Sequence, residues 1–125
     1  MTSDKPDTGS VGWIDLTVDD APALRDFYAA VVGWKSEPVP MGEYDDYSMT
    51  DGRGTPRAGV CHRRGSNAGL PAAWIAYFVV ADLERSMAEV TARGGKVLEP
   101  PRGEGGRFAI VEDPAGAVCA LYQAG

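Results

Sequence analysis

One pattern of residues occurs twice in this chain, about sixty positions apart, and this repeat constrains the fold more than any other feature. Residues 11–18 are apolar and β-branched, which predicts a strand, and acidic residues that can cap a helix follow them. Residues 73–80 and Asp82 give the same order in the second half. Each copy continues with an amphipathic helix that we expect to end at a glycine, Gly33 or Gly94. A repeat of this kind predicts two modules of one supersecondary structure.

Short strand-like segments follow each predicted helix and complete the modules. They are residues 34–39, 44–50 and 57–62 in the first half, and 96–99, 107–112 and 117–122 in the second. The sequence therefore predicts an α+β protein built from two βαβββ modules. We expect a flexible N-terminal tail over residues 1–10 and a single domain over 11–125, divided into module one (11–62), a linker (63–71) and module two (72–123).

The composition narrows the range of partners. Eighteen acidic and twelve basic residues give a net charge of −6, which argues against a nucleic-acid or membrane partner. The longest apolar run has ten residues, fewer than the roughly 20 that cross a bilayer, and no secretory signal opens the chain. Cys61 and Cys119 are too few for a disulfide scaffold, and we expect them to be buried structural thiols. These features predict a cytoplasmic protein.

Several motifs together carry a resemblance to a known family. They are Leu16-Thr17-Val18-Asp19-Asp20, Leu24-Arg25-Asp26-Phe27-Tyr28, Val32-Gly33-Trp34, Trp74-Ile75-Ala76-Tyr77, Gly94-Gly95-Lys96-Val97 and Asp113-Pro114-Ala115-Gly116. In this combination the chain resembles the vicinal oxygen chelate (VOC) superfamily, in its glyoxalase and bleomycin-resistance-like branch, over residues 11–122. The resemblance implies that each module curls its mixed sheet into half of a cup, that the cup holds a small molecule, and that the protein is a homodimer.

Metal-dependent members of this superfamily bind a divalent ion with His and Glu side chains from the first and last strands of each module. The resemblance places Trp13, Trp74 or Ile75, and Ala120 at three of these positions, and none of these side chains ligates a metal. His62, the only histidine, falls near the fourth position. We interpret it as an exposed histidine at a strand end, so the sequence predicts no metal and no cofactor.

Two groups of carboxylates need separate interpretation. Asp15 lies two residues after Trp13 and therefore shares its face of the strand. If that face lines the cup, Asp15 is either an acid–base catalyst with a perturbed pKa or a structural aspartate bonded to the backbone, and the sequence leaves both open. The cluster of Glu43, Asp45 and Asp46 is interpreted as a solvated hairpin.

Alternate residues of the curved sheet are expected to line the ligand pocket. The predicted ligand-binding residues are Trp13, Asp15, Tyr47, Met49, Trp74, Tyr77, Phe108 and Tyr122. Aromatic walls with a few polar tips suit a planar ligand, and we expect Arg102 and Arg107 to meet an anionic group on it. The leading hypothesis is a metal-free protein that sequesters or senses an apolar or aromatic molecule. The alternatives are an interaction module and a VOC enzyme (lyase, isomerase or dioxygenase), metal-dependent or using Asp15 as acid or base.

Overall fold

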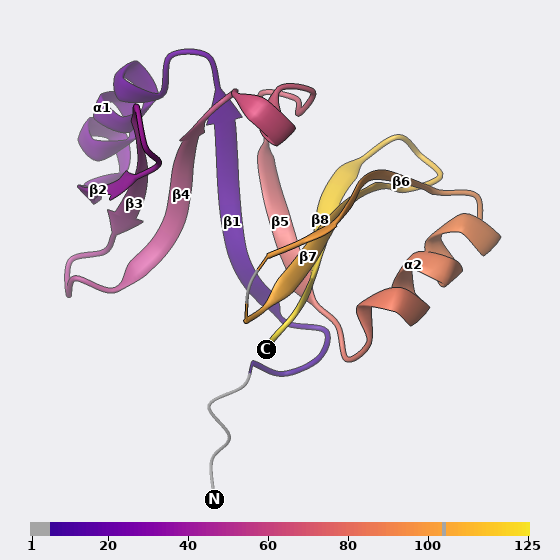
Figure 1. The fold of residues 1–125 in the computed structure, drawn as a ribbon. Helices are drawn as coiled ribbons and strands as arrows, with labels where there is room; N and C mark the ends of the chain where they lie inside the picture. The colour runs from indigo at the N-terminus through magenta and orange to yellow at the C-terminus, as the bar shows by residue number, and fades with distance from the viewer. Residues whose placement is uncertain (1–5, 104) are drawn as a thin grey trace, which may run out of the picture. The chain divides into compact units, whose positions relative to one another are not determined.

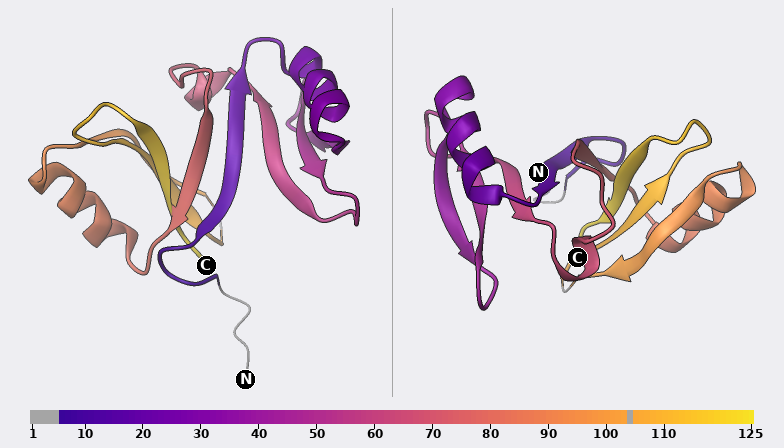
Figure 2. Two further views of the ribbon diagram at one scale, coloured as in Figure 1. Left: turned by 180° about the vertical axis from the view of Figure 1, so that it is seen from behind. Right: turned by 90° about the horizontal axis from the view of Figure 1, so that it is seen from above.

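The computed structural model describes residues 6–103 and 105–125, which divide into two compact units. We call residues 14–74 the N-terminal module. The C-terminal module consists of residues 75–125 together with the described residues up to Trp13. Each module contains one α-helix beside its strands (Figures 1 and 2). The predicted α+β class and the strand, helix, three-strand order of both halves are confirmed.

The N-terminal module has a four-stranded mixed sheet. Its elements are β1 (Val11–Val18), α1 (Ala21–Val32), β2 (Lys35–Pro40), β3 (Asp45–Thr50), β4 (Pro56–His62) and the 3₁₀ turn η1 (Gly65–Asn67). The strands lie in the order β2-β3-β4-β1, with β1 and β4 parallel and the other neighbours antiparallel. Helix α1 packs against β3 and β4.

Packing under α1 separates the two faces of this sheet. Leu16, Met49 and Val60 point toward the helix and form, with Val18, Ala21 and Ala58, a buried core. Because side chains alternate along a strand, the residues between them point to the opposite face. We call this second surface, which carries Asp15, Asp46 and Cys61, the open face of the module.

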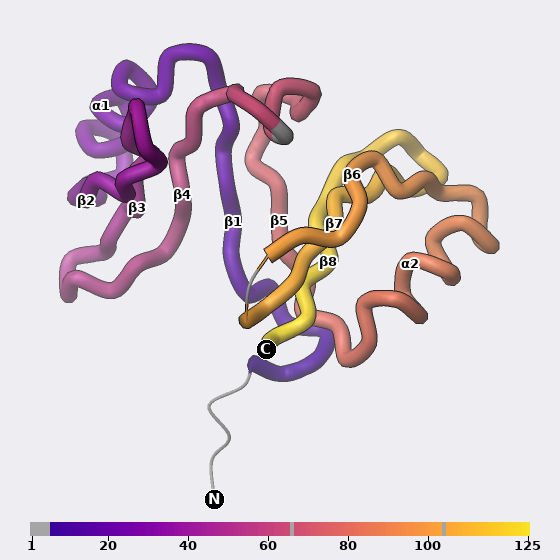
Figure 3. Tube along the Cα trace, in the orientation of Figure 1, coloured from indigo at the N-terminus to yellow at the C-terminus, as the bar shows by residue number. Residues whose placement is uncertain are grey.

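The C-terminal module repeats this arrangement. It contains β5 (Trp74–Val79), whose first residue belongs to the N-terminal module, α2 (Leu83–Ala92), β6 (Lys96–Arg102), β7 (Arg107–Glu112) and β8 (Val118–Gln123). The order is β5-β8-β7-β6, with β5 and β8 parallel. The tube in Figure 3 follows the chain from β5 through α2 and back along β6.

The helix ends show how closely the two modules correspond. The carboxylate of Asp20 accepts a hydrogen bond from the Ala23 amide (3.1 Å), and Asp82 accepts one from the Arg85 amide (3.2 Å). Both are helix N-caps, which satisfy backbone donors that the first turn leaves free. Gly33 and Gly94, just beyond the helices, have φ of 87° and 92°, the left-handed conformation that favours glycine.

The start of the ordered chain differs from the sequence prediction. The Gly9 amide donates to the Val79 carbonyl (2.8 Å), and the Val79 amide donates to the Ser10 carbonyl (2.9 Å). Ladder pairing thus begins two residues earlier than expected, while residues 1–5 of the predicted tail lie outside the described residues. Strand β6 is also longer than the predicted 96–99, since it continues to Arg102 across two irregularities in its pairing with β7.

Gly95 gives a test of how tightly α2 approaches its sheet. A Cβ at this position would stand 2.6 Å from the Glu112 carbonyl oxygen and 2.9 Å from Val90 Cγ1. We expect Gly95→Ala to lower the free energy of unfolding by about 1–3 kcal/mol, the cost typical of overpacking. Urea denaturation gives the measurement. Gly52→Ala is the control, because a Cβ there meets nothing within 4 Å. Equal midpoints for the two variants would contradict the expectation.

Candidate functional site

Four aromatic side chains line a cavity of about 420 Å³ in the C-terminal module. They are Trp13, Tyr77, Phe108 and Tyr122, joined by Pro6 and Gly12. We call this cavity the aromatic pocket. All four were predicted as ligand-binding residues from the alternation of the strands, and the structure brings them together. Their role in binding a ligand stays a prediction.

Strand register explains why these residues meet. Phe108 on β7 pairs with Tyr122 on β8, and Tyr77 on β5 pairs with Ala120 on β8. Because Ala120 and Tyr122 are two residues apart, the side chains of Tyr77, Phe108 and Tyr122 emerge on one face. Ala120 lies beside these residues in the ladder and is fully buried.

The rings form walls with defined contacts. The centroids of Tyr77 and Phe108 are 5.4 Å apart at an interplanar angle of 52°. The guanidinium carbon of Arg102 lies 4.8 Å from the centroid of the Phe108 ring, a cation–π arrangement. Gly106 allows Tyr122 to lie against its loop, since a Cβ there would come within 2.7 Å of Tyr122 Cε1.

The two arginines expected at this pocket have different surroundings. Arg102 stacks on Phe108, which is part of the pocket wall. Arg107, by contrast, donates a hydrogen bond to Glu84 on α2 (3.0 Å). Its guanidinium is therefore held toward the helix, whereas that of Arg102 lies over the pocket wall.

Three other predicted ligand-binding residues lie on the helix side of the N-terminal module. Met49 is fully buried in the core beneath α1. Tyr47 packs against the same core, with the guanidinium carbon of Arg25 4.7 Å from its ring centroid. Trp74 Nε1 donates a hydrogen bond to the Tyr28 hydroxyl (3.1 Å). None of the three lines the aromatic pocket.

The orientation of strand β3 explains why Tyr47 and Met49 face α1 and do not line the aromatic pocket. The sequence prediction placed Tyr47 and Met49 on the same face as Asp15. In the structure Tyr47 pairs with Val60, a core residue, so the odd-numbered residues of β3 face α1. The usable signal was polarity: Asp46, Ser48 and Thr50 alternate with the two apolar residues, and the helix covers the apolar set.

Comparisons with known proteins agree with this architecture. A family model described as Glyoxalase/Bleomycin resistance protein/Dioxygenase superfamily matches residues 10–121. The chain belongs to this superfamily.

No helix among the described residues is long and apolar enough to span a bilayer.

Curated relatives of this superfamily domain share about a third of its residues. It is 34% identical over 121 residues to putative glyoxylase CFP32 of Mycobacterium tuberculosis (strain CDC 1551 / Oshkosh), covering 93% of this chain and 46% of that protein. It is 31% identical over 131 residues to anthracycline biosynthesis protein DnrV of Streptomyces peucetius, covering 94% and 48%. The chain thus spans about half the length of the curated relatives it matches.

Solved structures with the same fold are more distant in sequence. Methylmalonyl-CoA epimerase from Mycobacterium tuberculosis superposes with a TM-score of 0.63 at 13% identity, covering 100% of this chain and 93% of that chain. A glyoxalase/bleomycin resistance protein/dioxygenase superfamily member from Vibrio splendidus 12B01 gives 0.60 at 15% identity, covering 88% and 95%. At these identities the likeness shows the fold alone.

The residues that the family resemblance places at metal positions do not fit a divalent ion. Trp13 lines the aromatic pocket, and Ile75 and Ala120 are buried apolar residues. Within residues 6–103 and 105–125, no three His, Cys, Asp or Glu side chains converge as metal ligands. The absence of a bound metal stays a prediction.

His62 and Asp46 differ from their sequence interpretations, because they are buried against each other. The His62 side chain is only 13% exposed, and its ring lies edge-on to Tyr44 at 5.1 Å. Asp46 is 8% exposed and accepts a hydrogen bond from the His62 amide (2.9 Å), with His62 Nδ1 3.4 Å from the same oxygen. The predictions that His62 is exposed and that Asp46 belongs to a solvated hairpin were therefore wrong. The cause is strand β3, which begins at Asp45 and brings Asp46 against the end of β4.

Asp15 lies half-buried on the open face of the N-terminal module, opposite Gly59 of β4. The neighbouring thiol of Cys61 is affected by this environment: burial first, and then the charges of Asp15 and Asp46, raise its pKa far above the ordinary range. Desolvation and negative charge both disfavour the thiolate. Cys119 in the C-terminal module has its pKa raised by burial and by Asp113.

Alkylation rates test this electrostatic arrangement. Because the thiolate is the reactive species, we expect Cys61 to react with iodoacetamide at pH 8 more slowly than Cys119. Asp46→Asn removes one negative charge, so the pKa of Cys61 falls and its alkylation rate rises several-fold, measured by peptide mass spectrometry. Asp45→Asn is the matched control, since Asp45 is exposed. Equal acceleration by both variants would argue against a specific effect of Asp46.

Proposed function

We propose that this chain binds a small, flat, largely aromatic molecule in the aromatic pocket, and that it does so without a metal ion. The observation that carries the proposal is the convergence of Trp13, Tyr77, Phe108 and Tyr122 on one cavity. Its volume of about 420 Å³ falls within the range of small-molecule sites. We include in the proposal that the protein acts as a cytoplasmic homodimer, in which it sequesters or senses this ligand.

The chemistry of the wall favours a ring system over an aliphatic chain. Aromatic side chains pair with other rings in offset or edge-to-face arrangements, which gain energy beyond the burial of apolar area. The hydroxyl groups of Tyr77 and Tyr122 add polar tips to an otherwise apolar surface. Arg102, stacked on Phe108, supplies a positive charge at the wall and favours a ligand with an anionic substituent.

The relatives give this choice of ligand some independent support. The relative DnrV is named for anthracycline biosynthesis, and anthracyclines are planar fused-ring compounds. A domain of the same superfamily with an aromatic pocket suits molecules of that shape. At 31% identity and half-length coverage, the activity in this name is that of DnrV and is not assigned to the present chain.

Anthraquinone-2-sulfonate, a planar anion, is a direct probe of the proposal. We expect it to quench tryptophan emission and to occupy the aromatic pocket with one molecule per chain. Phe108→Ala removes a wall of the pocket and the stacking surface of Arg102, so the Kd should rise at least tenfold, or about 1.4 kcal/mol. Calorimetric titration provides the affinity.

Phe78→Ala is the matched control for this substitution. Phe78 is the same residue type on β5, 38% exposed, and adjacent to Tyr77, so its side chain points to the opposite face. Its Kd should stay within twofold of the parent protein. Equal weakening in both variants, or no binding of the probe to the parent chain, refutes the aromatic pocket as the site.

A second candidate function is an enzyme that uses Asp15 as acid or base. The half-buried Asp15 carboxylate, which lies close enough to the Cys61 thiol for its charge to act there, favours this candidate, because general acid–base catalysis needs a positioned carboxylate. Neighbours of the same fold named as methylmalonyl-CoA epimerases show that this architecture hosts enzymes. This candidate predicts turnover, whereas the leading proposal predicts stoichiometric binding alone.

Metal removal separates the leading proposal from a metal-dependent enzyme. Dialysis against EDTA should leave the Kd for anthraquinone-2-sulfonate unchanged, because no metal-ligand cluster occurs among the described residues. Calorimetric titration with Mg²⁺, Mn²⁺, Fe²⁺, Co²⁺, Ni²⁺ and Zn²⁺ should give no stoichiometric binding. A stoichiometric ion would contradict this expectation.

Deuterium exchange tests the acid–base candidate. If the protein exchanges deuterium into methylmalonyl-CoA, and if Asp15→Asn abolishes this exchange while the affinity for the probe is retained, the acid–base enzyme is established.

A further inference from the structure

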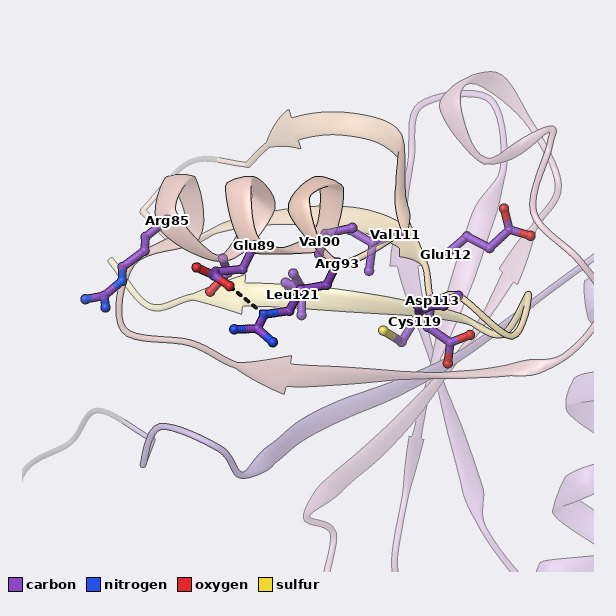
Figure 4. A pocket seen from close by; sticks show the side chains of 12 residues that line it. Arg85, Glu89, Val90, Arg93, Val111, Glu112, Asp113, Cys119 and Leu121 are labelled. Carbon is purple, nitrogen blue, oxygen red and sulfur yellow. Dashed lines mark hydrogen bonds and ion pairs between the residues drawn. The ribbon is translucent and has the colours of Figure 1, made fainter.

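A second cavity, of about 410 Å³, lies in the C-terminal module between α2 and the helix-facing side of its sheet (Figure 4). We call it the α2 hollow. Val90 on α2, Val111 on β7, and Cys119 and Leu121 on β8 line its interior. Val111 and Cys119 are cross-strand partners, and Ala109 pairs with Leu121, so these side chains share the face opposite to Phe108 and Tyr122. The α2 hollow is therefore separate from the aromatic pocket.

In the N-terminal module, aromatic rings fill the space between the helix and the sheet. Tyr28 on α1 lies 6.3 Å from Trp34 and 5.1 Å from Trp74, measured between ring centroids. The two indoles are 5.9 Å apart in an edge-to-face arrangement. All three rings pack against the core of Leu16, Met49 and Val60.

The repeat identifies the counterparts of these residues in the C-terminal module. The helix caps Asp20 and Asp82 are 62 positions apart, so Val90 corresponds to Tyr28 and Ser86 corresponds to Leu24. The strand pairs agree, since Met49 opposite Ala58 corresponds to Val111 opposite Cys119.

The C-terminal module thus has small residues at positions where the N-terminal module has large ones. Gly33 and Gly94, 61 positions apart, end the two helices, so the next residue, Gly95, corresponds to Trp34. Gly95 has no room for a side chain, because a Cβ would meet the Glu112 carbonyl oxygen and Val90. The α2 hollow therefore lies where the Tyr28 ring packs in the N-terminal module, and no described side chain of the C-terminal module fills it.

We propose that the α2 hollow is a second binding site, which takes a free planar aromatic molecule of about the size of an indole. The lining by Val90, Val111 and Leu121 gives the apolar contact that a ring face requires. Arg93 also lines the hollow and donates a hydrogen bond to Glu89 (2.7 Å), the dashed line in Figure 4. The Arg93 side chain is 80% exposed. A guanidinium in this place stacks on the outer face of a bound ring.

Cys119 makes occupancy of the α2 hollow measurable, because its thiol lines the cavity and is half-buried. In a Cys61→Ser background, indole at saturating concentration should slow alkylation of Cys119 by N-ethylmaleimide at least fivefold, as measured by mass spectrometry. Methyl shifts of Val111 and Leu121 in a ¹³C-resolved NMR titration with indole give a second readout that does not depend on the thiol. No protection and no methyl shifts would overturn the proposal.

Ser86→Leu restores the residue type of the first module and should fill the hollow. We expect it to abolish the indole-dependent methyl shifts and to raise the Tm. Ala88→Leu is the matched control, since Ala88 is an exposed residue of α2 that does not line the hollow. Shifts that persist in Ser86→Leu, or that disappear equally in Ala88→Leu, would place indole elsewhere and overturn the proposal.

Two further measurements separate the α2 hollow from the aromatic pocket and from a contact between two copies of the chain. Phe108→Ala should leave the protection of Cys119 by indole unchanged. The proposal of binding in the aromatic pocket and the proposal of binding in the α2 hollow can therefore fail independently. Protection that rises with protein concentration in the absence of indole, together with dimer formation in sedimentation velocity, would show that a side chain of a second copy occupies the hollow. That result would overturn the assignment to a free small molecule.

Discussion

The packing of each helix against one face of its sheet is the constraint on which the rest of this structure depends. In the N-terminal module, α1 covers Leu16, Met49 and Val60, which are buried together. Once an apolar face is covered, the alternation of the strands assigns every remaining side chain to the other face. The polar open face that carries Asp15, Asp46 and Cys61 follows from this packing.

The two modules show how one backbone plan produces different surfaces. Both helices begin with an aspartate cap and end before a glycine of positive φ, and both lie on a sheet with the same strand order. The first module fills its helix–sheet interface with Tyr28, Trp34 and Trp74, whereas the second leaves a cavity. On the face away from α2, the second module instead concentrates its rings around the aromatic pocket. Aromatic side chains are therefore structural in one module and available to a ligand in the other.

The residues that the family resemblance places at metal positions are apolar in this chain. Trp13 contributes a wall of the aromatic pocket, and Ala120 is fully buried. A cavity with these walls gains affinity from ring contacts and the exclusion of water. Asp15 and Asp46 lie instead on the open face of the N-terminal module, where burial and then their charges raise the pKa of Cys61.

The sequence by itself determined the α+β class, the two modules, the helix caps and the aromatic pocket residues Tyr77, Phe108 and Tyr122. These features depend on neighbours within a few positions: a cap acts over one turn, and alternation runs along one strand. Only the tertiary structure decided that the apolar side chains of β3, Tyr47 and Met49, lie under α1 rather than in the ligand pocket. Polarity separates the two faces of a strand, but an apolar face can pack against a helix or line an apolar pocket. The burial of His62 with Asp46, and the hollow under α2, likewise arise from contacts between segments far apart in the chain, where no local pattern signals them.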